Sequence, residues 1–103
     1  STLAKFKALV NQHHREWHGT SDYASALHIT PDYLNRIVKS QTGKTAKEHI
    51  QSRIIVAAKR LLYFSDLSNK EIGFQLGFSE PANFSAFFKN CVGQSPSQFK
   101  ANV

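Results

Sequence analysis

A pattern of residue types occurs twice in this chain, and it limits the folds that the sequence can adopt. Residues 23–30 match residues 72–79 at an offset of 49, and residues 34–43 match residues 84–93 at an offset of 50. The two copies share small, apolar, turn and capping positions, as one supersecondary unit used twice would require. The change of offset places a single extra residue in the second copy.

The segment between the copies, residues 46–64, predicts one long helix. It contains no Gly or Pro, and a T-x-x-E capping box at Thr45 and Glu48 marks its start. A helix of this length spans roughly 28 Å. Its apolar residues recur with the spacing of one helix face: Ile50, Ile54, Ala57, Ala58, Leu61 and Leu62. We expect Ile50 and Ile54 to pack in a first core and Leu61 and Leu62 in a second. Residues 55–59 should then matter less for contacts than for length.

The first copy predicts two short helices joined by a turn, the helix-turn-helix pattern. Thr20-Ser21 would cap a helix over residues 22–27. Thr30 would cap a second helix over residues 31–42, with Pro31 in its first position and Gly43 at its end. The predicted buried stripe of this second helix consists of Tyr33, Leu34, Ile37 and Val38. His28 stands where the second copy has Gly77, so its turn is either left-handed, as glycine allows, or differently shaped.

The second copy predicts a helix over residues 69–76, opened by the capping box of Ser68 and Glu71. Ser79 would cap the next helix, over residues 80–92, and Gly93 would end it. The predicted buried stripe of that helix consists of Phe84, Phe87, Phe88 and Cys91.

The two ends of the chain add one helix each. Leu3, Phe6, Val10, His13 and Trp17 follow a helical spacing, which predicts a first helix that ends before the glycine at position 19. A third capping box opens a terminal helix that contains Phe99; its residues are Ser95 and Gln98. No segment alternates with period two, so we expect an all-α fold of seven helices. Two helix-turn-helix subdomains, residues 1–45 and 65–103, would be joined by the linker helix 46–64 within a single domain.

The histidines of the first helix do not predict a metal site. His14 and His18 have an i, i+4 spacing, but no third ligand stands nearby at a known spacing. We expect His13 and Trp17 to pack, and His14 and His18 to be solvated. No cofactor or metal is expected elsewhere.

Composition narrows the class of partner. The chain has a net charge of +6, which is typical of proteins that bind nucleic acid or an anionic membrane, although a basic domain without such a partner has the same composition. No apolar run approaches the ~20 residues of a membrane span, and a lone cysteine excludes a disulfide framework. A reducing, cytosolic compartment fits the single cysteine. The chain contains no Met, and we expect sequence that precedes Ser1 in a longer protein.

Each copy contains a longer motif. The motif of the first copy is Ala24-x-x-Leu27-x-Ile29-Thr30-Pro31-x-Tyr33-Leu34-x-Arg36-x-Val38-Lys39 with Gly43. The motif of the second copy is Ile72-Gly73-Phe74-x-Leu76-Gly77-Phe78 followed by Phe84-Ser85-x-Phe87-Phe88-Lys89 and Gly93-x-Ser95-Pro96-x-x-Phe99. On these motifs the sequence resembles the DNA-binding domains of AraC/XylS-type bacterial transcription regulators, over about residues 3–100.

The resemblance implies a single DNA-binding domain over residues 1–103. It implies sequence-specific binding of double-stranded DNA, with residues 31–42 and 80–92 in successive major-groove segments. It also implies a separate N-terminal effector or dimerisation domain, and a cytoplasmic location in a bacterium, at the nucleoid.

The resemblance further implies which residues contact DNA. The expected base contacts are Asp32, Asn35, Arg36, Pro81, Ala82, Ser85 and Ala86. The expected contacts to the backbone or the groove edge are Thr30, Lys39, Glu80, Asn83 and Lys89. Arg36 suits guanine and Asn35 suits adenine, whereas Asp32 either accepts from cytosine or stabilises the helix start. The small residues of the second helix predict that the first copy supplies most of the base specificity.

Two other classes of function compete with DNA binding. A protein-interaction module would use the Phe-rich faces to contact RNA polymerase or a regulatory domain, with only weak non-specific DNA binding. RNA polymerase is an expected partner in either case. An enzyme is not expected, because the sequence offers no pair of nucleophile and base.

Overall fold

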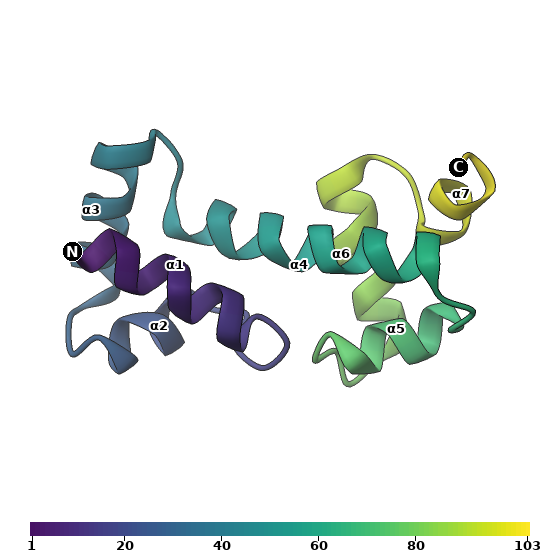
Figure 1. The fold of residues 1–103 in the computed structure, drawn as a ribbon, viewed down its shortest axis with the longest axis horizontal. Helices are drawn as coiled ribbons and strands as arrows, with labels where there is room; N and C mark the ends of the chain where they lie inside the picture. The colour runs from purple at the N-terminus through teal and green to yellow at the C-terminus, as the bar shows by residue number, and fades with distance from the viewer. The chain divides into compact units, whose positions relative to one another are not determined.

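The computed structural model describes residues 1–103 and is entirely helical (Figure 1). Its seven helices are α1 (Thr2–His13), α2 (Thr20–Ala26), α3 (Pro31–Thr42), α4 (Ala46–Phe64), α5 (Asn69–Gln75), α6 (Pro81–Val92) and α7 (Pro96–Ala101). The prediction of an all-α fold with seven helices is confirmed.

The chain divides into two compact units, Ser1–Arg53 and Ile54–Val103, and the division falls within α4. Each unit thus contains one helix-turn-helix and one part of the long helix. The predicted boundaries of the subdomains, at residues 45 and 65, stay a prediction. Neither unit contains a helix that could cross a membrane, and no group of three or more His, Cys, Asp or Glu side chains is placed to hold a metal ion.

The core of the first unit is built around Phe6 and Tyr23, both fully buried. Their rings meet edge to face with centroids 5.7 Å apart, a favourable geometry for aromatic pairs. The Tyr23 hydroxyl donates to the carbonyl of Trp17 at 2.9 Å, so this polar group is not lost on burial. Burial, with Asp22 and Glu16 nearby, raises the pKa of Tyr23 to about 12. Leu34 and Val38 bring α3 into the same buried set.

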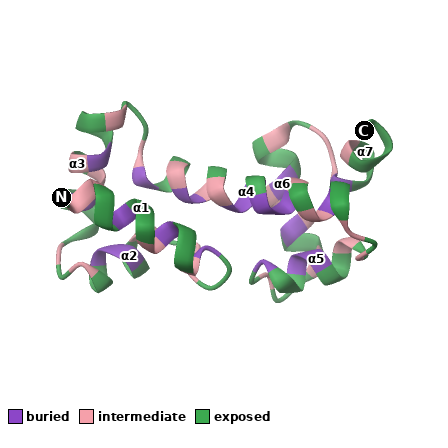
Figure 2. Cartoon of the chain, viewed as in Figure 1, coloured by how far each residue is buried: buried purple, intermediate pink, exposed green.

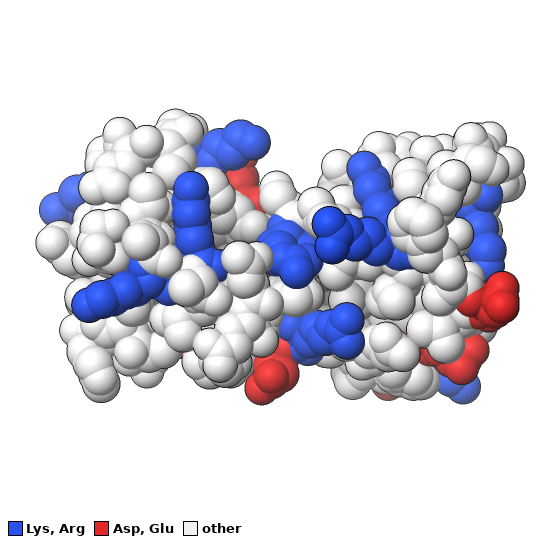
Figure 3. Space-filling model, in the orientation of Figure 1, with Lys and Arg blue, Asp and Glu red and all other residues white.

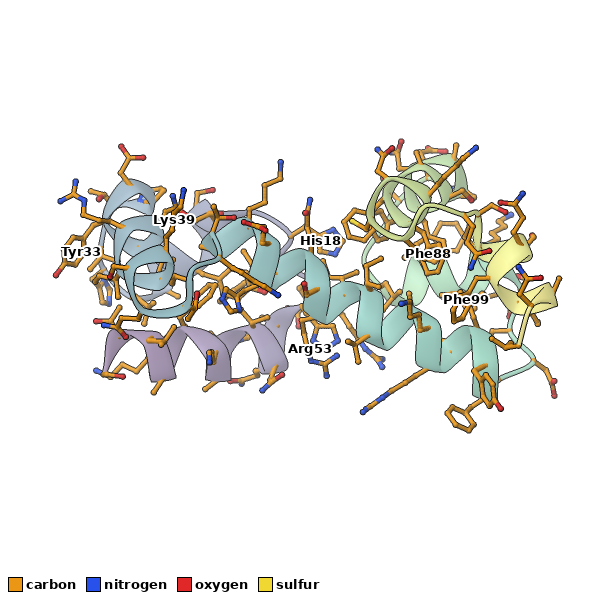
Figure 4. The ribbon with its side chains drawn as sticks, turned by 90° about the horizontal axis from the view of Figure 1, so that it is seen from above. His18, Tyr33, Lys39, Arg53, Phe88 and Phe99 are labelled. Atoms are coloured by element: carbon orange, nitrogen blue, oxygen red, sulfur yellow. The ribbon has the colours of Figure 1, made fainter.

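The core of the second unit is an aromatic cluster on α6. Phe84 and Phe88 are fully buried, and the Phe88 ring lies 5.7 Å from that of Phe99 on α7. Figure 2 colours the buried segments of α6 purple, and Figure 4 labels Phe88 and Phe99. Gly73 allows α5 to approach this cluster, because a Cβ on Gly73 would stand 3.0 Å from the Cβ of Phe84. The equivalent pair in the first unit is Ala24 and Leu34. The smaller residue on the first helix is thus paired with the larger residue on the second. The first unit has Ala24 with Leu34, and the second has Gly73 with Phe84.

Four helix starts have the caps that the sequence predicts. The Thr30 hydroxyl accepts from the N–H of Tyr33 at 3.1 Å, and both hydrogen bonds of the capping box are present at Thr45, Ser68 and Ser95. Two predicted caps are wrong. Gly19, not Thr20-Ser21, is the N-cap of α2, and Glu80, not Ser79, is the N-cap of α6; neither makes a side-chain cap. The extra residue of the second copy moves that start by one position.

Two residues of the predicted buried stripes are exposed. Tyr33 is 48% exposed, and Cys91 also lies on the surface. Of the predicted stripes, only Leu34 and Val38 on α3 and Phe84 and Phe88 on α6 are fully buried. The middle of α4 departs from expectation in the opposite direction. Ile55, Ala57 and Ala58 are buried. Ile54, which was expected to pack in the first core, is the first residue of the second unit.

The first helix also departs from its predicted end. α1 stops at His13, and a turn places the Trp17 ring on that of His13 with centroids 3.9 Å apart. His14, predicted to be solvated, is 6% exposed. Its Nδ1 lies 3.1 Å from the carbonyl oxygens of Val10 and Asn11, and these partners satisfy the buried ring.

The turns of the two helix-turn-helix units have the same geometry. His28 has a φ of 57° and Gly77 a φ of 91°, both left-handed. The N–H after each of them bonds the carbonyl five residues before, Ile29 to Ala24 at 3.0 Å and Phe78 to Gly73 at 2.9 Å. This is the Schellman motif at the end of a helix. The open question at His28 is thus settled in favour of a left-handed residue.

Replacing His28 with glycine is expected to stabilise the protein by about 1 kcal/mol, because it removes a side chain from a left-handed conformation. The gain should appear as a higher urea midpoint with an unchanged m-value. His28→Ala retains a Cβ and is the matched control, with no gain expected. A loss of stability in His28→Gly would contradict the strain argument.

Candidate nucleic-acid interface

The exposed side of α3 is a continuous surface, and we call it the first reading face. It exists because Leu34 and Val38 hold the opposite side of α3 in the core. Residues 32, 33, 36, 39 and 40 share this side by helical spacing, and all are exposed: Asp32, Tyr33, Arg36, Lys39 and Ser40. Thr30, at the start of the helix, is also exposed, but its hydroxyl is used by the cap.

The exposed side of α6 is the second reading face, held outward by Phe84 and Phe88. Its exposed residues are Ala82, Asn83, Ala86, Lys89 and Asn90, with Glu80 before the helix. Pro81 and Ser85 are half-buried beside them. Every residue predicted to contact DNA therefore lies on, or next to, one of the two reading faces. Whether these residues contact DNA stays a prediction.

The two reading faces differ in chemistry at equivalent positions. Arg36 corresponds to Ala86, Asp32 to Ala82 and Tyr33 to Asn83 at the offset of 50. Only the lysine near the end of each helix, Lys39 or Lys89, has the same identity and exposure in both. The first face has long donors and an aromatic ring, whereas the second has mostly small groups. The first face therefore offers more hydrogen-bonding groups than the second.

Sequence reasoning missed Tyr33 as a surface residue. It is nearly half exposed and projects outward from α3 (Figure 4). Its apolar class and its place next to Leu34 suggested burial. The signal that could have corrected this is the repeat, because the equivalent residue is the polar Asn83.

Asn35, predicted to contact bases, has a partner inside the protein. Its Oδ1 accepts a hydrogen bond from the backbone N–H of Ala46 at 3.0 Å, and the side chain is half-buried. Asn35 also lines a groove of about 340 Å³ with Thr20, Pro31, Asp32, Thr45 and Lys47. Asn35 therefore has a hydrogen-bonding role within the protein itself.

Basic side chains are more prominent than acidic ones on the visible surface. In Figure 3 Lys and Arg cover more of that surface than Asp and Glu, although most of it belongs to other residues. The net charge of +6 agrees with this view. Such a surface attracts polyanions and steers their approach.

None of the titratable groups with a shifted pKa is a member of either reading face. Burial lowers the pKa of His14, and the nearby Arg53 lowers it further. Arg53 in turn donates from Nε to the side-chain oxygen of Asn11 at 2.9 Å. Burial also lowers the pKa of His49, whose Nε2 lies 2.9 Å from the Thr42 hydroxyl. These groups bear on stability rather than on recognition.

Stability is expected to fall as the pH drops from 7.5 to 5.0. A histidine whose folded pKa is lowered binds its proton more readily in the unfolded state, so its stabilising effect is present above about pH 6.5 and is lost below it. His14→Gln should flatten the dependence of Tm on pH, and His14→Gln with His49→Gln should flatten it further. The pKa values of the Glu48 and Glu71 carboxyl groups are lowered. Protonation of these carboxylates therefore changes stability only at a pH below this window. An unchanged pH profile in both variants would contradict the assignment.

A family model described as a helix-turn-helix domain matches residues 23–102. The Msm operon regulatory protein of Streptococcus mutans is 34% identical over 104 residues, which cover 94% of this chain and 37% of that protein. This chain thus spans little more than a third of that relative.

Two solved structures are similar over almost the whole chain. The C-terminal domain of AraT, a response regulator from Geobacillus stearothermophilus, has a TM-score of 0.91 and 23% identity, covering 99% of this chain and 85% of that chain. The DNA-binding domain of AdpA, solved in complex with a target DNA, has a TM-score of 0.85 and 25% identity, covering 99% of this chain and 92% of that chain.

The repeated helix-turn-helix units and their exposed second helices define a class of DNA-binding modules. The chain belongs to the AraC-type family of helix-turn-helix domains. This family is one of transcription regulators and not of enzymes. The resemblance inferred from the two motifs is confirmed.

Proposed function

We propose that this chain binds double-stranded DNA in a sequence-specific manner as the DNA-binding domain of a transcription regulator. The observation that supports this most directly is the duplicated unit: two left-handed turns with the same hydrogen bonds, each followed by a helix whose outer side is exposed. A helix of this kind fits the major groove of B-DNA. One chain would therefore offer two recognition helices, α3 and α6, each for its own groove segment.

The first reading face would supply most of the base specificity. Arg36 can donate two hydrogen bonds to guanine O6 and N7, a pairing worth ~1–3 kcal/mol of discrimination. Tyr33 joins it as an exposed ring on the same face, able to contact a thymine methyl group or a phosphate. Asp32 stands in the first turn of α3, where a carboxylate is stabilised by the helix dipole.

The second reading face would contribute mainly backbone contacts and shape readout. Lys89 can neutralise a phosphate. Ala82 and Ala86 permit a close approach to the groove and contact with thymine methyl groups, but they offer no hydrogen bond. Contacts of this kind fix the position of a protein on DNA more than they select its sequence.

The regulatory partners belong to the same proposal. A regulator of this family would act on RNA polymerase and would respond to a signal through another domain. Its place in the cell would then be the bacterial nucleoid. These points rest on the family to which the chain belongs.

Selection of binding sites from random duplex DNA tests the proposal. We expect enrichment of a motif with two blocks of preferred bases, one for each unit. The block assigned to the first unit should have the higher information content. Affinity for the selected site should fall steeply with added salt, because phosphate contacts release counterions.

A lack of enrichment over bulk DNA would contradict the proposal. Binding to RNA polymerase without sequence-selective DNA binding would favour the protein-interaction module instead. Lys39→Ala and Lys89→Ala provide internal controls, since each should weaken binding to all sequences and reduce the salt slope by about one.

A further inference from the structure

The hydrogen bond of Asn35 has a specific structural use. Ala46, whose N–H it binds, is the first residue of α4 and is fully buried. The first N–H groups of a helix have no partner within the helix. The capping box of Thr45 and Glu48 uses only the N–H groups of those two residues. Asn35 therefore satisfies a buried donor that the helix and its cap leave unpaired.

The same bond fixes the orientation of the Asn35 amide. A backbone N–H can only donate, so the amide atom that faces Ala46 is the oxygen. The NH₂ group must lie on the other side of the amide. Asn35 lines the groove at the starts of α2, α3 and α4, so this NH₂ group is available to a ligand that reaches the groove.

The second unit has no such bond, and its sequence explains why. The residues equivalent to Asn35 and Ala46 are Ser85 and Pro96. Proline has no N–H and is well suited to the first position of a helix. Pro96 is fully buried at the start of α7 and needs no acceptor from α6. The unit that has a buried N–H at this helix start, on Ala46, therefore also has the Asn35 amide that accepts from it, and the unit with Pro96 has neither.

We propose that Asn35 is a positioning residue that ties the recognition helix α3 to the start of α4 through its amide oxygen, while its NH₂ group donates to DNA. The second half of this inference rests on the proposed function. An amide that presents its donor side pairs with acceptors: phosphate oxygens, guanine O6 and N7, or thymine O4. Adenine N7 is an acceptor as well, and the amide oxygen has a second lone pair that can accept from adenine N6 while it holds the N–H of Ala46. The expectation that Asn35 reads adenine therefore stays a prediction.

A double-mutant cycle tests the positioning role in the whole chain. Asn35→Ala should lower Tm by about 4–8 °C, because it leaves the buried N–H of Ala46 unpaired. In the Ala46→Pro background, where that N–H is gone, Asn35→Ala should lower Tm by less than half as much. An equal fall in both backgrounds would overturn the positioning role.

Asn35→Asp provides a second test that does not depend on the proline variant. The aspartate keeps an acceptor for the N–H of Ala46 and loses the donor. We expect its Tm to lie within about 2 °C of the wild type, well above that of Asn35→Ala. A fall as large as that of Asn35→Ala would count against the hydrogen bond.

The donor role is measured by DNA affinity in the Ala46→Pro background. There Asn35→Ala should weaken binding by about 2–12-fold, the effect of one hydrogen bond. A loss shared by all duplex sequences identifies a phosphate acceptor, and a loss confined to one base pair identifies a base. Unchanged affinity would overturn the donor role. If the wild type shows no preference for any duplex, the proposed function fails, whereas the Tm cycle still decides the positioning role.

Discussion

Phe84→Ala is expected to destabilise the second unit by about 3–5 kcal/mol, the cost of removing a large ring from a close-packed core. Phe84 is fully buried, and its ring centroid lies 5.5 Å from that of Phe78 and 6.1 Å from that of Phe88. Gly73 lies against its Cβ without a side chain that could turn into the cavity. Folded proteins are stable by only about 0.05–0.15 kcal/mol per residue, or ~2.5–7.5 kcal/mol for a unit of the length of Ile54–Val103. This loss should therefore unfold much of the second unit.

Hydrogen exchange measured residue by residue provides the readout. We expect protection to fall most in α5, α6 and α7 and to persist in α1, α2 and α3, since each unit has its own core. Leu34→Ala is the equivalent change in the first unit and should produce the reverse pattern. Tyr63→Ala, at a residue that is 59% exposed, is the surface control and should change stability by no more than about 0.5 kcal/mol. Equal loss of protection in both units after Phe84→Ala would show that they unfold together.

Local signals in the sequence were sufficient to predict the helices. Capping residues mark helix starts through hydrogen bonds between near neighbours in the sequence. These bonds are present at Thr30, Thr45, Ser68 and Ser95. The length of α4 follows from a run without helix breakers. The predicted N-caps of α2 and α6 were wrong, because in both helices the N-cap residue makes no side-chain hydrogen bond.

Burial was harder to predict, because it depends on which other helix covers each side. Tyr33 and Cys91 were misassigned by their apolar class, although the equivalent residues Asn83 and Gln41 are polar. A position that holds a polar residue in either copy is better assigned to the surface. His14 lies outside the repeat, so no second copy could correct it.

The reading faces could be located from the sequence, but the hydrogen bonds around them could not. The bond from Ala46 to Asn35 joins residues eleven positions apart on two different helices. No pattern of spacing predicts it, because it depends on how α3 packs beside the start of α4. In the second unit Pro96 has no N–H, so the equivalent bond cannot form. From the sequence, this proline predicted only the start of a helix.

Arg36→Ala is expected to relax base preference at one position of the binding site by about 5–150-fold, which corresponds to ~1–3 kcal/mol for a bidentate contact with guanine. The side chain lies on the exposed side of α3, between Tyr33 and Lys39 in the order of that face. The loss should appear only against variants of one base pair, since a phosphate contact would weaken all sequences alike. Relative affinities for a panel of single-substituted sites measure it directly.

The matched comparison is Ser85→Ala in the second unit. Ser85 is half-buried beside Ala82 and Ala86, so its short hydroxyl has little reach toward a base edge, and we expect a smaller change in preference than for Arg36→Ala. Lys39→Ala tests the alternative that charge alone matters, because it should lower affinity for every member of the panel and reduce the salt slope by about one. Equal losses of specificity in Arg36→Ala and Ser85→Ala would contradict the division of labour between the two reading faces. If Arg36→Ala lowered affinity uniformly, Arg36 would be a phosphate contact, and the base specificity of the first unit would have to come from Tyr33, Asn35 or Asp32.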